Sequence, residues 1–92
     1  MNIYVVEGAA GCYSDHTQWP VKAFKEKRLA EDYMSLLNFQ SSRVIEEFNK
    51  TCGVVTPSVD KLLSLHEDRN YRLTGIPDYE TSYYVYELEL ED

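Results

Sequence analysis

The sequence predicts a small α+β domain with two layers, in which a three-stranded, mostly antiparallel sheet packs on one long and one short helix in the order β-β-α-α-β. Three observations lead to this fold class. A β-branched and aromatic run opens the chain, a 3.6-residue apolar period occupies its middle, and a two-residue alternation closes it. Because 92 residues is the size of one domain, we expect a single domain over residues 1–92.

The opening run, residues 3–7 (Ile-Tyr-Val-Val-Glu), predicts a strand, which we place at the centre of the sheet. Gly8 and Gly11 predict that this strand ends there and that a polar loop follows. Residues 18–24 predict a second strand. Since Pro20 has no backbone N–H to donate, this second strand belongs at an edge of the sheet.

The longest predicted element is a helix from Lys25 to about Cys52. Apolar residues recur along it in steps of three and four, as the helical period requires. These residues are Leu29, Ala30, Tyr33, Met34, Leu36, Leu37, Phe39, Val44, Ile45 and Phe48. The polar stretch 38–42 leaves a bend or break open, because its side chains compete for backbone hydrogen bonds. Gly53 predicts the end of the helix.

Two more elements are predicted in the second half of the chain. Thr56 as cap and Pro57 as the first helical residue predict a shorter helix that ends near residues 66–68. His66, at that end, is expected to complement the helix dipole. The alternation over residues 82–91 predicts the last strand.

The charge of the chain restricts its partners. Sixteen acidic residues against nine basic ones give a net charge of −7, which argues against general binding of duplex nucleic acid or of an anionic membrane surface. A basic protein, such as one built to hold RNA or DNA, would attract this chain, although solubility alone also accounts for the charge. The eight tyrosines suit a protein interface, although the preference of strands for aromatic residues is the simpler explanation for any one of them.

Nothing in the sequence predicts export, a metal or a cofactor. The N-terminus lacks the pattern of a secretory leader, and no apolar run approaches the ~18 residues of a membrane-spanning helix. We therefore expect a cytoplasmic location, with Cys12 and Cys52 as reduced thiols. The two cysteines stand in no metal-ligand spacing, and no glycine-rich phosphate loop is present.

The last strand carries the most informative surface. Its alternation places Tyr84, Tyr86, Leu88 and Leu90 on one face and Tyr83, Val85, Glu87, Glu89 and Glu91 on the other. If the first set packs on the helix, the second forms a partner-binding ridge with carboxylates about 7 Å apart, suited to a groove of Arg and Lys. The alternative is that the charges only protect an edge strand from aggregation.

A second candidate surface is basic. Lys22, Lys25, Lys27 and Arg28 gather at the end of the second strand and the start of the long helix. Such a cluster on an acidic protein is a candidate contact to RNA in a complex, although basic clusters of this kind are more often solvated. The alternative is an ordinary solvated face of the helix.

No catalytic site is predicted. Ser14, Asp15 and His16 are neighbours in sequence and do not form the pattern of a nucleophile with its base, and Cys12 near His16 is a turn thiol. The adjacent acidic pairs at 46–47 and 67–68 diverge on helices, so they cannot flank one bond. We expect a protein that is not an enzyme.

Four segments of the first third resemble small orphan proteins common in phages. They are Ile3-Tyr4-Val5-Val6, Gly11-Cys12-Tyr13-Ser14-Asp15-His16, Ala23-Phe24 and Ala30-Glu31-Asp32-Tyr33. As a whole, the chain is similar to phage-encoded anti-CRISPR proteins directed at the type I-F (Csy, Cascade-like) surveillance complex. This resemblance implies a stoichiometric inhibitor in the host cytoplasm that docks on the Cas proteins around the guide RNA and stops hybridisation of target DNA. It implies no interface residues, because the class shares no binding motif. The competing hypothesis is a small phage regulatory or adaptor protein that binds a different protein.

Overall fold

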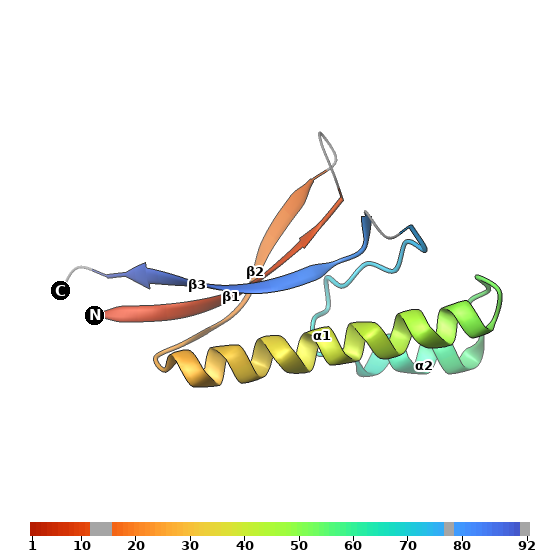
Figure 1. The fold of residues 1–92 in the computed structure, drawn as a ribbon, viewed down its shortest axis with the longest axis horizontal. Helices are drawn as coiled ribbons and strands as arrows, with labels where there is room; N and C mark the ends of the chain where they lie inside the picture. The colour runs from red at the N-terminus through yellow and green to blue at the C-terminus, as the bar shows by residue number, and fades with distance from the viewer. Residues whose placement is uncertain (12–15, 77–78, 91–92) are drawn as a thin grey trace.

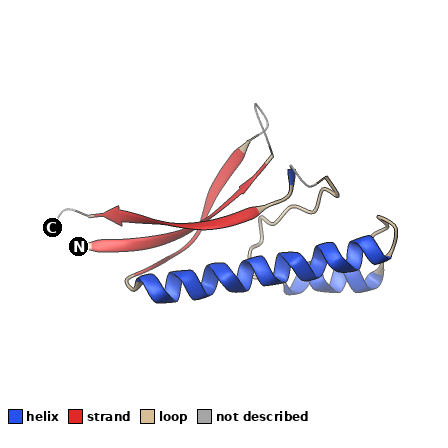
Figure 2. Cartoon of the chain, in the orientation of Figure 1, coloured by secondary structure: helices blue, strands red, loops and turns tan. Residues whose placement is uncertain are grey.

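The computed structural model of the chain describes residues 1–11, 16–76 and 79–90. Its helices and strands are β1 (Asn2–Ala10), β2 (Thr17–Phe24), α1 (Lys27–Lys50), α2 (Pro57–Leu65) and β3 (Ser82–Glu89). The strands form one antiparallel sheet in the order β2-β1-β3. Helix α1 covers one face of this sheet and α2 lies beside α1 (Figures 1 and 2). The predicted α+β architecture and the central position of the first strand are confirmed.

Strand β1 continues through Gly8 to Ala10, so the predicted end at Gly8 was wrong. Gly8 pairs with Trp19 on β2, and a Cβ atom on Gly8 would lie 2.8 Å from the indole ring. Glycine at this position therefore provides room for the indole and does not end the strand. Pro20 does lie on an edge strand, as expected.

Helix α1 is continuous through the polar stretch in its middle. The hydroxyls of Ser41 and Ser42 donate to the carbonyls of Leu37 and Asn38, at 2.9 and 3.0 Å, so they bond within the helix they were expected to weaken. The helix ends at Lys50. Three residues later, the N–H of Gly53 donates to the carbonyl of Phe48 at 3.1 Å, with φ of +80° at Gly53.

The core lies between α1 and the inner face of the sheet. Its buried apolar cluster comprises Val6, Ala30, Leu37 and Tyr83, against which Tyr4, Val21, Phe24, Tyr33, Met34 and Val85 are packed. The buried positions of α1 are Ala30, Leu37, Ser41 and Val44. Leu29, Leu36 and Phe39 are 49%, 40% and 59% exposed, so the buried stripe is narrower than the sequence predicted.

Helix α2 begins as predicted. The Thr56 hydroxyl accepts a hydrogen bond from the N–H of Val59, and Pro57 occupies the first turn. Within the described ranges, neither helix is long and apolar enough to cross a membrane.

The molecule is elongated, with extents of 51 × 29 × 15 Å. Its radius of gyration is 14.6 Å, against about 12 Å for a compact domain of this length. Figure 1 shows why: the ends of β1 and β3 near the chain termini extend past the first turn of α1. In the described part of the chain, no helix covers the outer face of the sheet.

Candidate partner-binding surface

The structure reverses the predicted orientation of β3. Tyr83 is 6% exposed and belongs to the core, and Val85 is half-buried against the same cluster. The face with Tyr84, Tyr86 and Leu88 is the one turned away from α1. A strict alternation defines two faces but does not say which one is covered, and the larger apolar set was wrongly assigned to the core. Tyr83 and Val85 are thus unavailable as the free contacts that the sequence predicted.

Glu87 and Glu89 are nevertheless exposed. We call the end of the β1–β3 ribbon near the chain termini, residues 1–3 and 87–90, the sheet tip. Met1, Leu88 and Leu90 on the tip are 58%, 43% and 40% exposed. The sheet tip therefore presents carboxylates on one face and apolar side chains on the other. Glu91 lies outside the described residues.

The outer face of β3 continues the apolar surface of the tip. Tyr86 is 37% exposed, and its ring centroid lies 6.5 Å from that of Tyr84. The Tyr84 hydroxyl donates to the Glu7 carboxylate, and this hydrogen bond raises the pKa of Tyr84 to about 12. Asn2 similarly donates its side-chain amide to Glu87. These cross-strand bonds fix the two strands in register.

The predicted basic cluster lies next to the sheet tip. Its four side chains, those of Lys22, Lys25, Lys27 and Arg28, are exposed. The Lys22 ammonium lies 5.3 Å from the ring centroids of both Phe24 and Tyr33, as in a cation–π contact.

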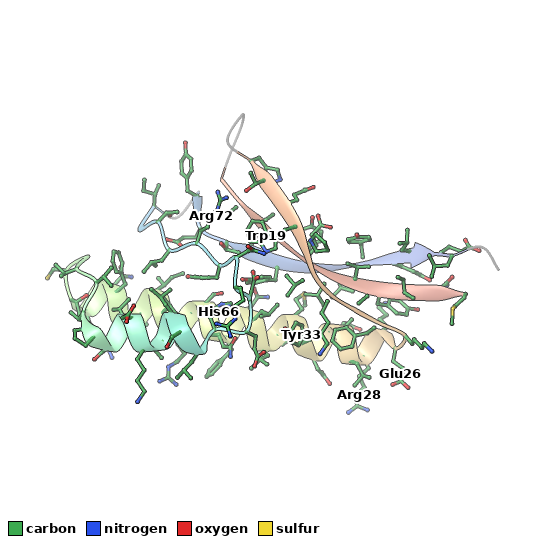
Figure 3. The ribbon with its side chains drawn as sticks, turned by 180° about the vertical axis from the view of Figure 1, so that it is seen from behind. Trp19, Glu26, Arg28, Tyr33, His66 and Arg72 are labelled. Carbon is green, nitrogen blue, oxygen red and sulfur yellow. The ribbon has the colours of Figure 1, made fainter. Side chains whose placement is uncertain are left out.

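Lys27 lines a hollow of about 330 Å³ together with Glu31 and Glu87. Figure 3 shows Arg28, with Glu26, pointing away from the sheet at the start of α1. The cluster is therefore mixed in charge on the side that faces the sheet tip, which weakens its attraction for a phosphate backbone.

A buried polar cluster lies at the opposite end of β3. We call it the Asp68 cluster; it consists of Trp19, Ser41, His66, Asp68 and Tyr83. Asp68 is 5% exposed, and one of its carboxylate oxygens accepts from the Trp19 indole at 2.9 Å and the Tyr83 hydroxyl at 2.7 Å. Its other oxygen accepts from the N–H of Asn70 at 3.0 Å. One carboxylate thus ties β2, β3 and the loop after α2 together.

His66 completes the cluster as a neutral ring. Its Nδ1 accepts from the N–H of Asp68 at 3.0 Å, which leaves Nε2–H to donate to the Ser41 hydroxyl at 3.0 Å. The ring stacks on Tyr71 with centroids 4.4 Å apart and lies between the helices and the sheet (Figure 3). Burial lowers the pKa of His66 and outweighs the Asp68 carboxylate, which raises it. The expected role as a cation at the helix end was therefore wrong.

Burial also raises the pKa of Tyr83, to which its hydrogen bond to Asp68 adds. Local sequence patterns do not predict this cluster, because Trp19 and Tyr83 lie 49 and 15 residues away from Asp68 along the chain. The signal available was a His and an Asp two residues apart at a helix end. Since all three donors to Asp68 come from the protein itself, we interpret the cluster as structural.

Two hollows elsewhere on the molecule are lined by residues that support the fold. One, of about 250 Å³, is lined by Ile45, Phe48 and Glu80 among others. Glu80 braces its loop there, accepting from the N–H groups of Thr74 and Gly75. The second lies between α1 and α2 and contains Phe39, above which the Arg43 guanidinium lies 5.9 Å from the ring centroid. Neither hollow brings together groups with reactive chemistry.

Cys12, Ser14 and Asp15 lie outside the described residues, and His16 is exposed just before β2. Cys52 is a free, exposed thiol. Among the described residues, no three His, Cys, Asp or Glu side chains are grouped so that they could hold a metal ion.

No protein-family model, curated protein or solved structure matches this chain. The surface must therefore be interpreted from its own geometry and charge.

Proposed function

We propose that the protein is a non-enzymatic phage inhibitor that binds the type I-F CRISPR–Cas surveillance complex stoichiometrically and blocks hybridisation of target DNA. The observation that carries the proposal is the sheet tip, where exposed carboxylates and exposed apolar side chains occupy a projecting ribbon. The sequence resemblance suggests the identity of the partner. The structure supplies a surface whose chemistry suits a basic protein.

The charge of the protein supports a partner of this kind. A complex that holds guide RNA and captures DNA must present Arg and Lys along its nucleic-acid path, and a chain of net charge −7 is attracted to that path. Glu87 and Glu89 would meet these cations, while Tyr86 and Leu88 would supply the apolar contact. An inhibitor bound there would occupy the space that target DNA needs.

The direct test is size-exclusion chromatography of the purified protein mixed with the type I-F complex, with and without guide RNA. We expect co-elution with the RNA-loaded complex and loss of its binding to target DNA. Because exposed charges are screened over about 10 Å at 0.1 M salt, affinity should fall as ionic strength rises. Absence of co-elution, or binding equally strong at low and high salt, would contradict the proposal.

A pair of double variants tests the surface. Changing Glu87 and Glu89 to Lys should weaken binding at least tenfold, because both carboxylates would then repel the basic partner. The matched control changes Asp32 and Glu46 to Lys on the exposed side of α1, which alters net charge equally. The control should lose much less affinity. Equal losses would show that only net charge matters and would remove the sheet tip from the proposal.

A pull-down from host lysate separates this function from that of an adaptor. Recovery of Cas proteins supports the inhibitor, and recovery of a different partner without Cas proteins supports the adaptor.

Contact between the basic cluster and guide RNA is tested with Lys25→Ala and Arg28→Ala together. We expect this variant to bind the RNA-loaded complex more weakly. If its affinity is unchanged, the cluster is an ordinary solvated face.

A further inference from the structure

Strand β3 lies at an edge of the sheet, and its hydrogen-bond register shows which backbone groups it presents on its outer side. Met1 donates its N-terminal amine to the Leu90 carbonyl at 3.2 Å, and the N–H of Leu90 donates to the Met1 carbonyl at 2.7 Å. Residues 1 and 90 are therefore a hydrogen-bonded pair of the antiparallel ladder. Because such pairs alternate, the even-numbered residues of β3 bond to β1.

The N–H and C=O groups of Val85, Glu87 and Glu89 then point away from β1, to the open side of the sheet. Within the part of the chain that the structure describes, no hydrogen bond occupies these groups. They form a row of alternating donors and acceptors, which is what an added strand requires.

The opposite edge of the sheet is protected. Strand β2 carries Pro20, which offers no N–H, and its pairing with β1 is shifted between Val6 and Glu7. A proline and an irregularity both discourage further pairing. In β3, by contrast, the register with β1 is regular from Ser82 to Glu89, and no proline interrupts it. The two edges differ in the features that decide whether a strand can add.

We infer that β3 binds its partner by strand addition, accepting a partner segment as a fourth strand of the sheet. This inference rests on the proposed function and specifies how the sheet tip is recognised. Glu87 and Glu89 lie two residues apart on one face, with Leu88 between them on the other. The added strand should therefore carry Lys or Arg at alternate positions, with an apolar residue between them.

A second copy of this chain is a poorer occupant of the same edge. Pairing two β3 strands would bring the two carboxylates of each copy to one seam between molecules of net charge −7. The charge of the edge thus selects a basic strand.

Two substitutions at one position isolate the backbone contribution. Glu87→Ala removes the carboxylate and keeps the outward N–H, whereas Glu87→Pro removes both and leaves the ladder with β1 intact. We expect the proline variant to bind the RNA-loaded type I-F complex at least tenfold more weakly than the alanine variant. Thermal unfolding of both variants checks that they are folded.

The wild-type chain supplies a second measurement that needs no substitution. The amides of Val85, Glu87 and Glu89 should exchange with deuterium rapidly in the free protein and become protected in the complex. Protection of these alternate amides supports strand addition.

The outcomes distinguish the inference from the function it rests on. If wild-type protein does not bind the complex, both fail. If it binds, but the proline and alanine variants bind equally well and the three amides stay unprotected, strand addition alone is overturned. Self-association that Glu87→Pro abolishes would assign the edge to a second copy and overturn the basic partner. Aggregation of Glu87→Ala with unchanged affinity would reduce the glutamates to a protective role.

Discussion

The two ends of β3 differ in whether their carboxylates are buried or exposed. At the Asp68 cluster a nearly inaccessible carboxylate accepts three hydrogen bonds from three segments of the chain. At the sheet tip the carboxylates of Glu87 and Glu89 stay in water, with Asn2 as the intramolecular donor to Glu87. The first end uses charge to hold the fold together. The second leaves charge exposed, and we expect substitutions there to cost little stability.

Of the substitutions that test this comparison, Asp68→Ala should lower the free energy of unfolding most. The substitution leaves the half-buried Trp19 indole, the buried Tyr83 hydroxyl and the N–H of Asn70 without their acceptor, and we expect a loss of about 3–5 kcal/mol in the free energy of unfolding. Urea unfolding followed by the fluorescence of Trp19, the one tryptophan, measures it. A loss below about 1 kcal/mol would mean that the cluster does not hold β2 and β3 in place.

A smaller effect is expected from Gly8→Ala. The added methyl group would lie 2.8 Å from the Trp19 indole, which must shift and strain its hydrogen bond to Asp68. We expect about 1–3 kcal/mol of destabilisation, as for other overpacked sites, and a changed tryptophan emission maximum. Ala9→Gly is the neighbouring control. If Gly8→Ala is as stable as wild type, the indole does not lie over Gly8.

The pH dependence of stability reports on His66. Because the folded state lowers the pKa of this ring, the unfolded chain binds the proton more readily. The stability that the neutral His66 ring contributes should be fully present above about pH 6.5. It should fall as the pH drops towards the folded pKa, by at most about 1.4 kcal/mol per pH unit. In the His66→Gln variant, the urea midpoint should change less between pH 7 and 5.5 than it does in the wild-type protein. A steeper profile in the variant would contradict a neutral native ring.

The smallest effect is expected at the sheet tip. Glu89→Ala and Leu90→Ser change exposed side chains, so each should alter the free energy of unfolding by less than about 0.5 kcal/mol. The same urea titration measures both. A loss above about 1 kcal/mol from either would show that the tip is part of the folded core, and the contrast between the two ends of β3 would fail.

The sequence predicted the elements well because their signals are local. The period of α1, the Thr56-Pro57 start of α2 and the alternation in β3 each depend on a few neighbouring residues. Pro20 correctly placed β2 at an edge, since proline removes a donor wherever the strand lies. The candidate site was predicted only in part: Glu87 and Glu89 are exposed, but the face that Tyr83 occupies was misassigned.

By itself, then, the sequence determined the order and type of the elements, the acidic charge and the two alternating faces of the last strand. Tertiary structure decided which of those faces is buried, because that depends on where α1 crosses the sheet and on the Asp68 carboxylate that draws the Tyr83 hydroxyl inward. It also decided that Gly8 accommodates an indole and that His66 stays neutral. Such outcomes follow from contacts between distant residues, and no local pattern in the chain encodes them.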